Sequence, residues 1–205
     1  GPLRYILQGE RTALNLLQHL SGISTKTREF VKKVEGLPVM ITDTRKTLPC
    51  LRLLQKYAVR VGGGRNHRFG LYDAIMLKDN HIAAAGGIKQ AVSTARKLTG
   101  HVTKIEVECE TLEQVREAAE SGVDIIMLDN MSLENMHEAV QIIAKRAVVE
   151  ASGGIKEQDI RKVAETGVDI ISIGSLTHSV KALDFSLDIG DIKQSTRQIL
   201  GLGEE

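Results

Sequence analysis

The chain has 205 residues, the size of one domain or of one domain with a small appendage. Its 42% of hydrophobic residues exclude a disordered protein, and its 3% of aromatic residues imply an aliphatic core. The net charge of +1 argues against a nucleic-acid binder, and no apolar run is long enough to span a membrane. Two widely separated cysteines in no metal-ligand spacing, and the lack of a signal-peptide pattern, predict a soluble cytoplasmic protein with free thiols.

The N-terminal part of the chain predicts two helices. Apolar residues recur at helical spacing over residues 10–20, and Gly22 is the expected stop. A second helix is expected over residues 25–34, ended by Gly36. Both belong to a predicted N-terminal helical segment, residues 1–36, that leads into the main domain.

The main domain, residues 37–205, alternates short apolar runs with amphipathic stretches. The expected strands are 39–41, 74–77, 105–107, 124–128, 147–149 and 169–173, and helices are expected over 112–120, 133–144 and 157–165. Residues 113–126 and 157–171 echo each other as a helix, a glycine and a buried strand. Strand–helix–strand order predicts a parallel sheet, and a recurrence of roughly 22 residues suits a barrel.

The predicted fold is therefore an α/β protein of the TIM-like (β/α) barrel type, incomplete or open, with the N-terminal helices packed on it. A doubly wound open sheet is the alternative. No glycine fingerprint follows the first strand, whereas polar residues gather at the ends of many strands, and this favours the barrel.

Cationic side chains follow several predicted strands and the loop before one of them. They are Arg45, Lys46, His67, Arg68 and Lys78. Reactive groups of a barrel collect at the C-terminal ends of its strands, so these side chains are expected around one opening. Such a cluster repels itself unless it holds an anion, which predicts a multiply charged substrate. The competing interpretation is that these residues only solvate different faces of the surface.

Carboxylates end two successive strands. Glu108 and Asp129 could share one Mg²⁺, which takes one or two carboxylates together with substrate oxygens and water. Without a metal, Asp129 would cap a helix and Glu108 would pair with a lysine.

Small residues follow the last two strands of the series, where barrels commonly hold a phosphate. The relevant residues are Ser152, Gly154, Gly174 and Ser175. Glycine lets the backbone approach an anion closely, whereas structural turns are the competing explanation.

Six strings at these positions resemble the quinolinate phosphoribosyltransferase family. They are TDTRKTLP (42–49), GGGRNHRFGLYDAIMLKDNHI (62–82), EVECETLEQ (106–114), MLDNMS (127–132), VEASGGI (149–155) and ISIGSLTHS (171–179). The stretch ERTALNLLQHLSGIST (10–25) also resembles the helix that leads into that family's barrel. The similarity extends over nearly the whole chain.

The resemblance implies transfer of phosphoribose from 5-phosphoribosyl 1-pyrophosphate to the ring nitrogen of quinolinate, followed by loss of the 2-carboxylate as CO₂. The implied catalytic residues are Lys46, Lys78, Glu108 and Asp129. Quinolinate would be held by Arg45, Lys46, His67 and Arg68, Lys78 would contact both substrates, and the 5-phosphate would lie on Ser152, Gly154, Gly174 and Ser175. Glu108 and Asp129 would face the ribose hydroxyls and Mg²⁺.

The resemblance also implies a homodimer, in which Arg11 reaches a neighbouring subunit's pocket. The family normally carries a further N-terminal domain before Glu10, so we expect a chain without it, or a companion chain that supplies it. Three alternatives stay open: a related barrel enzyme that uses another small acid, an aldolase-like barrel with Lys78 as a Schiff-base lysine, and an inactive fragment that only binds a ligand or a partner chain.

Overall fold

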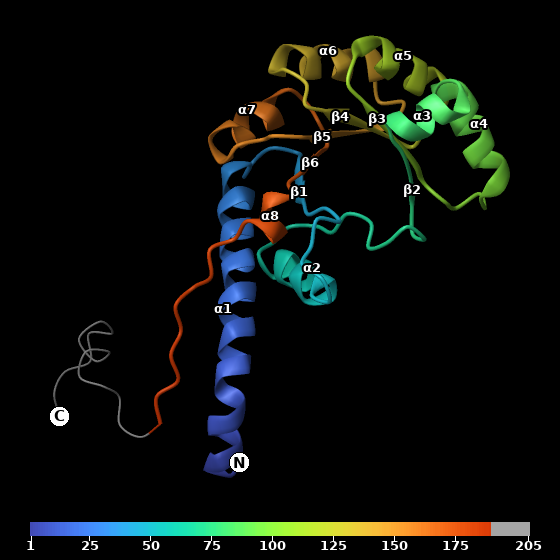
Figure 1. Ribbon diagram of the computed structural model, residues 1–205. Helices are drawn as coiled ribbons and strands as arrows, with labels where there is room; N and C mark the ends of the chain where they lie inside the picture. Colours follow the sequence, from blue (N-terminus) through green and yellow to red (C-terminus); the bar gives the residue numbers. More distant parts are fainter. Residues whose placement is uncertain (190–205) are drawn as a thin grey trace.

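Six parallel strands form one sheet in the computed structural model, which describes residues 1–189. The strands are β1 (Met40–Thr42), β2 (Ile75–Leu77), β3 (Ile105–Cys109), β4 (Ile125–Asp129), β5 (Val148–Ser152) and β6 (Ile170–Ser172). Their order across the sheet is β1-β6-β5-β4-β3-β2. β1 and β2 are the edges of the described sheet, and an isolated bridge joins Thr42 of β1 to Arg65. The sheet arches as an open barrel (Figure 1), which confirms the predicted fold.

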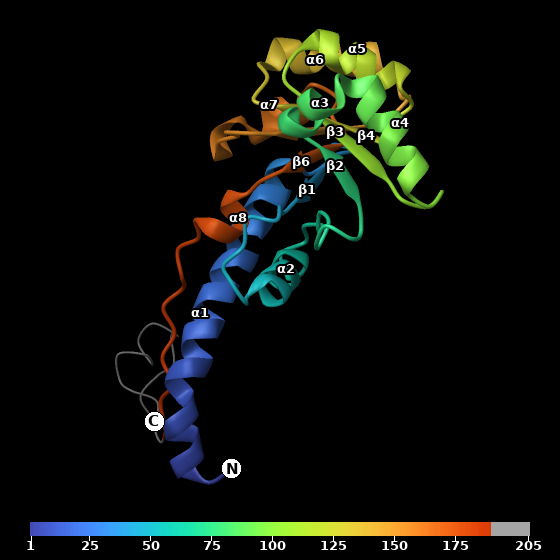
Figure 2. The ribbon, with the colours of Figure 1, turned by 45° about the vertical axis from the view of Figure 1, so that its right-hand side comes forward.

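Residues 1–189 contain eight α-helices and one 3₁₀ turn, and α4 to α7 cover the outer face of the arch (Figure 1). The helices are α1 (Leu3–Lys33), α2 (Arg52–Val61), α3 (Asp79–Ala85), α4 (Ile88–Leu98), α5 (Leu112–Glu120), α6 (Leu133–Ile143), the 3₁₀ turn η1 (Glu157–Asp159), α7 (Ile160–Glu165) and α8 (Ser175–His178). Of these, α4 packs on β2 and β3, α5 on β3 and β4, α6 on β5, and α7 on β6. Figures 1 and 2 show α4 to α7 side by side over the strands, and the concave face lies on the opposite side. All six predicted strands and the three predicted helices are present.

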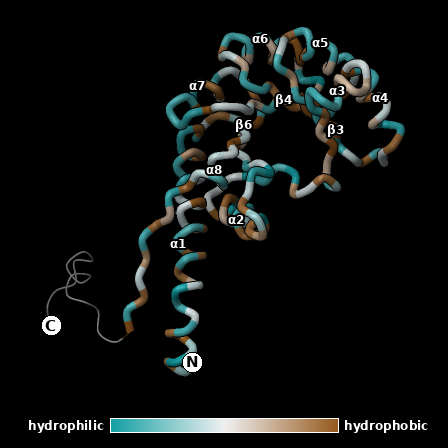
Figure 3. The backbone as a smooth tube through the Cα atoms, in the orientation of Figure 1, coloured by the Kyte–Doolittle hydropathy of each residue, from teal (hydrophilic) through white to brown (hydrophobic). Residues whose placement is uncertain are grey.

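The alternation of side chains along the strands separates the core from the concave face. In β3, Ile105, Val107 and Cys109 are fully buried, and the last two belong to the core cluster beneath the helices. Successive side chains of a strand point to opposite faces, so Glu106 and Glu108 point to the concave side. Figure 3 shows hydrophobic residues concentrated in the strands and hydrophilic ones recurring along the outer helices.

The prediction of two N-terminal helices is wrong, because α1 runs without a break through Gly22. Gly22 is buried where the segment around Val180 and Lys181 crosses the helix, and a Cβ there would lie 2.3 Å from the backbone oxygen of Lys181. The same segment is hydrogen-bonded to Gln18 of α1. The backbone oxygen of Gln18 accepts from the Leu183 N–H at 3.0 Å, and its side-chain Nε2 donates to the Phe185 oxygen at 2.9 Å. The glycine therefore serves close packing and does not stop the helix.

The boundary proposed after residue 36 falls between α1 and β1, and the division into two domains stays a prediction. Residues 190–205 of the second predicted domain lie outside the described residues. Over residues 1–189, none of the helices combines the length and the apolar character that crossing a membrane would need.

Candidate functional site

A cavity of about 540 Å³ lies at the C-terminal ends of the strands. Its lining comprises Thr44, Arg45, Lys46, His67, Arg68, Met76, Lys78, Glu108, Met127, Asp129, Asn130, Ser152, Gly153, Gly154 and Ser172. Nine of the predicted site residues are among them: Arg45, Lys46, His67, Arg68, Lys78, Glu108, Asp129, Ser152 and Gly154. Most of the cavity lining therefore consists of residues that the sequence predicts for the site.

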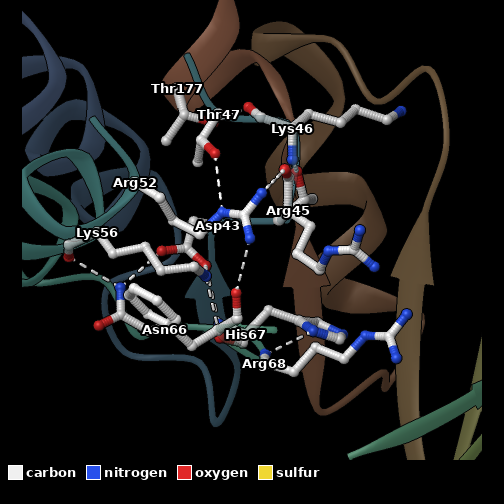
Figure 4. Close-up of polar contacts among 12 residues, drawn as sticks. Asp43, Arg45, Lys46, Thr47, Arg52, Lys56, Asn66, His67, Arg68 and Thr177 are labelled. Atoms are coloured by element: carbon white, nitrogen blue, oxygen red, sulfur yellow. Dashed lines mark hydrogen bonds and ion pairs between the residues drawn. The ribbon is translucent and has the colours of Figure 1, made fainter. Parts of the chain in front are cut away.

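Arginine and lysine side chains form one side of the cavity. Arg45 and Lys46 follow β1, and Arg68 comes from the loop after α2; Figure 4 shows all three extending toward the same side. Burial lowers the pKa of Arg68, and the nearby charge of Arg45 lowers it further. Two guanidinium groups that repel each other inside a cavity are suited to a ligand that carries several negative charges.

Asp43 joins the two basic loops. Its carboxylate accepts hydrogen bonds from Lys56 Nζ at 2.5 Å, Asn66 Nδ2 at 2.6 Å and the backbone N–H of His67 at 2.9 Å. Lys56 also donates to the backbone oxygen of His67 at 3.0 Å. Asp43 lies two residues before Arg45, and its partners Asn66 and His67 lie directly before Arg68, so this buried network ties together the two segments that carry the arginines (Figure 4).

Arg52 at the start of α2 forms a second link between the same loops. Its Nε donates to Thr47 Oγ1 at 3.0 Å, and one terminal nitrogen donates to the Phe69 oxygen at 3.1 Å. Thr177 of α8 donates to the backbone oxygen of Lys46 at 2.6 Å. The bonds to Arg45 and Lys46 from Arg52 and Thr177 use their backbone oxygens, so among residues 1–189 the charged ends of both side chains are left to meet a ligand.

An ion pair and a second carboxylate form the opposite side. Lys78 follows β2 and donates to Glu108 Oε2, and Asp129 ends β4. Asn130 donates to Asp129 Oδ2 at 3.0 Å and has a φ of 54°.

A small-residue loop after β5 completes the cavity at Ser152, Gly153 and Gly154. A Cβ on Gly153, whose φ is 85°, would lie 2.4 Å from Asn130 Oδ1, so glycine is required there. The two other predicted phosphate residues, Gly174 and Ser175, are outside the cavity lining. Gly174 is nevertheless close to it, because a Cβ there would lie 3.1 Å from Lys46 Cδ.

Arg11 is the remaining predicted residue. It lies on the exposed N-terminal half of α1 and is not part of the cavity of this chain. The role predicted for Arg11 requires a second subunit and stays a prediction.

A charged cluster lies on the concave face below the cavity. His67 Nε2 is 3.2 Å from Glu106 Oε2 and 3.3 Å from Glu150 Oε1, and both carboxylates are buried. Burial would lower the pKa of His67, but its bonds to the two carboxylates outweigh this and raise the pKa to about 10. Burial raises the pKa of Glu106; the bond from His67 opposes that shift and the charge of Glu150 adds to it.

The Arg68 backbone N–H acts against the upward shift of the His67 pKa, because it lies 2.7 Å from Nδ1 and needs a lone pair on that atom. The two carboxylates favour a ring that is protonated on both nitrogens, whereas the Arg68 N–H requires an unprotonated Nδ1. The peptide N–H cannot change its role, so we take Nδ1 as the acceptor and Nε2 as the protonated nitrogen.

Sequence reasoning did not assign a role to several residues of the site. Glu106, Glu150 and Asp43 stand inside or beside apolar strand runs, and a charge in such a run was the signal that could have revealed them. Met76, Met127 and Ser172 line the cavity from strand positions, which only the observed register identifies.

Three comparisons place this chain among known proteins. The pattern described as the quinolinate phosphoribosyl transferase C-terminal domain matches residues 23–188. A protein of Bacillus subtilis named probable nicotinate-nucleotide pyrophosphorylase (carboxylating) is 53% identical over 92% of this chain, and the human nicotinate-nucleotide pyrophosphorylase (carboxylating) is 40% identical over 92%. The chain spans 65% of the length of each of these two relatives.

The crystal structure of NadC from Streptococcus pyogenes is 54% identical, with a TM-score of 0.87 over 91% of this chain and 65% of that one. A Pyrococcus furiosus nicotinate-nucleotide pyrophosphorylase, at 18% identity and a TM-score of 0.67, shares the fold over 86% of this chain and 51% of that one. The match over most of the chain and the high identities show that this protein belongs to the quinolinate phosphoribosyltransferase family.

Proposed function

We propose that this site transfers phosphoribose from 5-phosphoribosyl 1-pyrophosphate to quinolinate and releases pyrophosphate and CO₂, which gives nicotinate mononucleotide for NAD biosynthesis. The observation that carries the proposal is that Arg45, Arg68 and Lys78 share one cavity with Glu108 and Asp129. Both substrates are polyanions, so this arrangement can hold them together against their mutual repulsion. The B. subtilis and human relatives bear the name of this activity.

The basic side of the cavity suits quinolinate. Arg45 and Arg68 each present a planar group that can bind a carboxylate through two parallel hydrogen bonds. Lys46 adds a compact charge, and Lys78 is placed to contact both substrates. We propose His67 as part of the same subsite, because it directly precedes Arg68 and lines the cavity.

The loop after β5 suits the 5-phosphate of the donor. Ser152 supplies a hydroxyl, and the backbone of Gly154, at a φ of 58°, is open to close approach. Gly174 and Ser175 precede and begin α8, and we place them at the edge of the same phosphate subsite.

The carboxylates suit the chemistry at the ribose. Attack by the pyridine nitrogen on C1′ breaks the bond to pyrophosphate, and positive charge develops on the ribose carbon as that bond breaks. Glu108 and Asp129 can stabilise this charge and bind the ribose hydroxyls. After transfer, CO₂ departs and leaves the electron pair of the broken bond on the ring carbon beside the cationic nitrogen, which stabilises it. That carbon then takes a proton from water, so the protein has mainly to hold the ring in place.

We also propose that Glu108 and Asp129 bind Mg²⁺. The donor set fits this metal, because hard oxygen ligands line one side of the cavity and the amide of Asn130 adjoins them. Two carboxylates do not fill a Mg²⁺ shell, so oxygens of the donor and water would complete it. When bound, the ion neutralises charge on the pyrophosphate. Lys78, paired with Glu108, would then be released toward the substrates.

A homodimer, with Arg11 reaching the pocket of the second subunit, and a cytoplasmic location complete the proposal. Support for the dimer comes from the exposed side chains along the N-terminal half of α1, including Tyr5 at 66% and Leu17 at 52% exposure. Support for the cytoplasm comes from two free cysteines, Cys50 and Cys109.

The test is a product assay with the full-length protein that contains this sequence. We expect pyrophosphate, CO₂ and nicotinate mononucleotide in equal amounts from quinolinate and the donor. Pyrophosphate release with another pyridine acid, and none with quinolinate, would instead identify a related enzyme with a different acceptor. Absence of turnover together with absence of quinolinate binding by calorimetry would contradict the proposal. It would favour a protein that only binds another ligand or a partner chain.

A further inference from the structure

Both ring nitrogens of His67 contact protein groups. Nδ1 accepts a hydrogen bond from the backbone N–H of Arg68 at 2.7 Å, and Nε2 is directed at Glu106, 3.4 Å from Oε1 and 3.2 Å from Oε2. Oε1 of Glu150 is 3.3 Å from the same nitrogen. An imidazole nitrogen that accepts an N–H bond carries no proton, so the ring proton lies on Nε2, facing the carboxylates. His67 thus has a fixed tautomer and a fixed ring plane before any ligand arrives.

Glu106 and Glu150 do not reach the cavity. Each is 1% exposed, and neither belongs to the cavity lining, although Glu108 and Ser152, two positions further along the same strands, do. Burying two carboxylates is costly unless they meet a donor, and His67 is the side chain that both of them contact. Oε1 of Glu150 has no aligned hydrogen bond within residues 1–189, so the Nε2 proton is its nearest favourable contact.

Arg68 is fixed at its backbone by this arrangement. The Arg68 N–H is bound by Nδ1 of His67, and a terminal guanidinium nitrogen donates to the Ala74 oxygen at 3.0 Å. Holding a binding group in its final orientation lowers the entropy that ligand binding has to remove. A contiguous series of contacts therefore runs from the buried strands β3 and β5 through the His67 ring to the Arg68 backbone, from which the guanidinium extends.

We propose that Glu106 and Glu150 are positioning residues that act through the His67 ring to orient Arg68 for the acceptor carboxylate. In this arrangement His67 supports the quinolinate subsite from below, and its nitrogens stay bound to the protein while the acceptor binds. The inference rests on the proposed function for the identity of the acceptor, but its structural part, the tautomer and contacts of His67, does not depend on turnover.

A metal ion is the competing occupant of this cluster, since ligand atoms of His67, Glu106 and Glu150 all lie within 4.8 Å of one another. A histidine binds a metal through an unprotonated nitrogen. Nε2 would have to lose its proton while Nδ1 still faces the Arg68 N–H, which would leave an imidazolate. The observed contact at Nδ1 therefore favours the proton over the metal.

The first test measures the ring nitrogens of His67 by NMR in the full-length protein labelled with ¹⁵N at histidine. We expect an unprotonated Nδ1 and a protonated Nε2, with no change of tautomer when quinolinate is added. Protonation of Nδ1, a ring nitrogen that responds to quinolinate as a direct ligand would, or loss of the Nε2 proton on titration with Zn²⁺ or Mn²⁺ would each overturn the proposal. This measurement needs no variant, so it decides the matter even where a substitution prevents folding.

The second test uses Glu150→Gln, which keeps the shape of the side chain and removes its charge. We expect KM for quinolinate to rise about tenfold, as for the loss of one charge-assisted hydrogen bond between a misoriented Arg68 and the acceptor, with KM for the donor unchanged. In a His67→Ala background the same substitution should have no further effect, because the contact acts through the ring. The control is Glu165→Gln, an exposed carboxylate paired with Arg161, which should change neither constant.

Equal rises in both KM values, or additive effects of the Glu150 and His67 substitutions, would overturn the proposal. A wild-type protein that neither turns over nor binds quinolinate would instead contradict the proposed function. The NMR measurement would still report on the tautomer in that case, so the two failures are distinguishable.

Discussion

The carboxylate of Asp43 and the ammonium of Lys56 lie 2.5 Å apart, with 0% and 3% of their side chains exposed. Burial raises the pKa of Asp43, and its bonds to Lys56, His67 and Asn66 oppose that shift. The pair therefore supports the folded state only as long as both members are present.

Replacing Lys56 by Met should leave Asp43 buried without its cation. We expect the free energy of unfolding to fall by about 3–5 kcal/mol, measured by urea denaturation. The control is Arg116→Met, which breaks the exposed Arg116–Glu138 pair and should cost about 0.5 kcal/mol or less. Equal losses for the two variants would show that burial of the Asp43 pair has no special weight.

Arg68→Ala should weaken quinolinate much more than the donor. Arg68 lies on the basic side of the cavity, whereas the residues proposed for the phosphate lie at Ser152 and Gly154. Loss of a bidentate charged contact predicts a decrease in quinolinate affinity of roughly 10- to 100-fold, measured by calorimetry with each ligand alone. A similar loss for both ligands would mean that the two subsites are assigned wrongly.

Glu108→Gln should reduce turnover and its dependence on Mg²⁺ while the fold persists. The side chain is 14% exposed and, within residues 1–189, its hydrogen-bond partner is Lys78, so its loss should have little effect on the core. We expect kcat to fall by about 100-fold or more, since this carboxylate faces charge that develops in the transition state. Circular dichroism is the control for folding, and an unfolded variant would indicate a structural carboxylate instead.

Asp124 should make stability depend on pH in the acid range. Burial opposes the shift, but bonds from Lys104, the Ile105 N–H and Arg96 lower the pKa of Asp124 from 3.8 to about 2. The unfolded state thus binds the proton more readily, so this contribution is complete above pH 4 and is lost as the pH falls toward 2.

Comparison with Asp124→Asn isolates this effect. At pH 6 the variant should be less stable by about 1 kcal/mol, a value reduced for the partial exposure of the pair. The difference should shrink between pH 4 and pH 2, measured by urea unfolding at each pH. A difference that stays constant over this range would exclude a role for the Asp124 charge.

The barrel and most of the cavity could be predicted from the sequence because two periodicities coincide. Apolar runs place the strands, and polar residues at their ends, such as Lys78, Glu108 and Asp129, fall on one rim. The strand ends do not reveal Glu106 and Glu150, because these residues lie inside β3 and β5, two positions before Glu108 and Ser152. Their role depends on His67, which is far from both in the sequence, and only the folded chain shows that contact.

The course of α1 could not be predicted for a related reason. Glycine lowers helix stability in general, and the sequence around Gly22 contains no sign of a partner. The partner is the segment around Val180 and Lys181, which lies beside the helix only in the folded structure. Tertiary packing therefore outweighs local propensity at this position.

Two glycines of α1 offer a matched comparison of these forces. Gly9 has no neighbour within 4 Å of a built Cβ, so Gly9→Ala should stabilise the helix by about 0.5–1 kcal/mol. The same change at Gly22 places a methyl group 2.3 Å from the Lys181 oxygen and 2.9 Å from Val180 Cγ1. Backbone atoms would have to move, so we expect Gly22→Ala to destabilise the protein by about 1–3 kcal/mol despite its better helix propensity.

Hydrogen exchange at Leu183, whose N–H donates to the Gln18 backbone oxygen, should accelerate in the Gly22 variant and not in the Gly9 variant. Stabilisation by both substitutions would show that the C-terminal segment does not lie against α1 in solution.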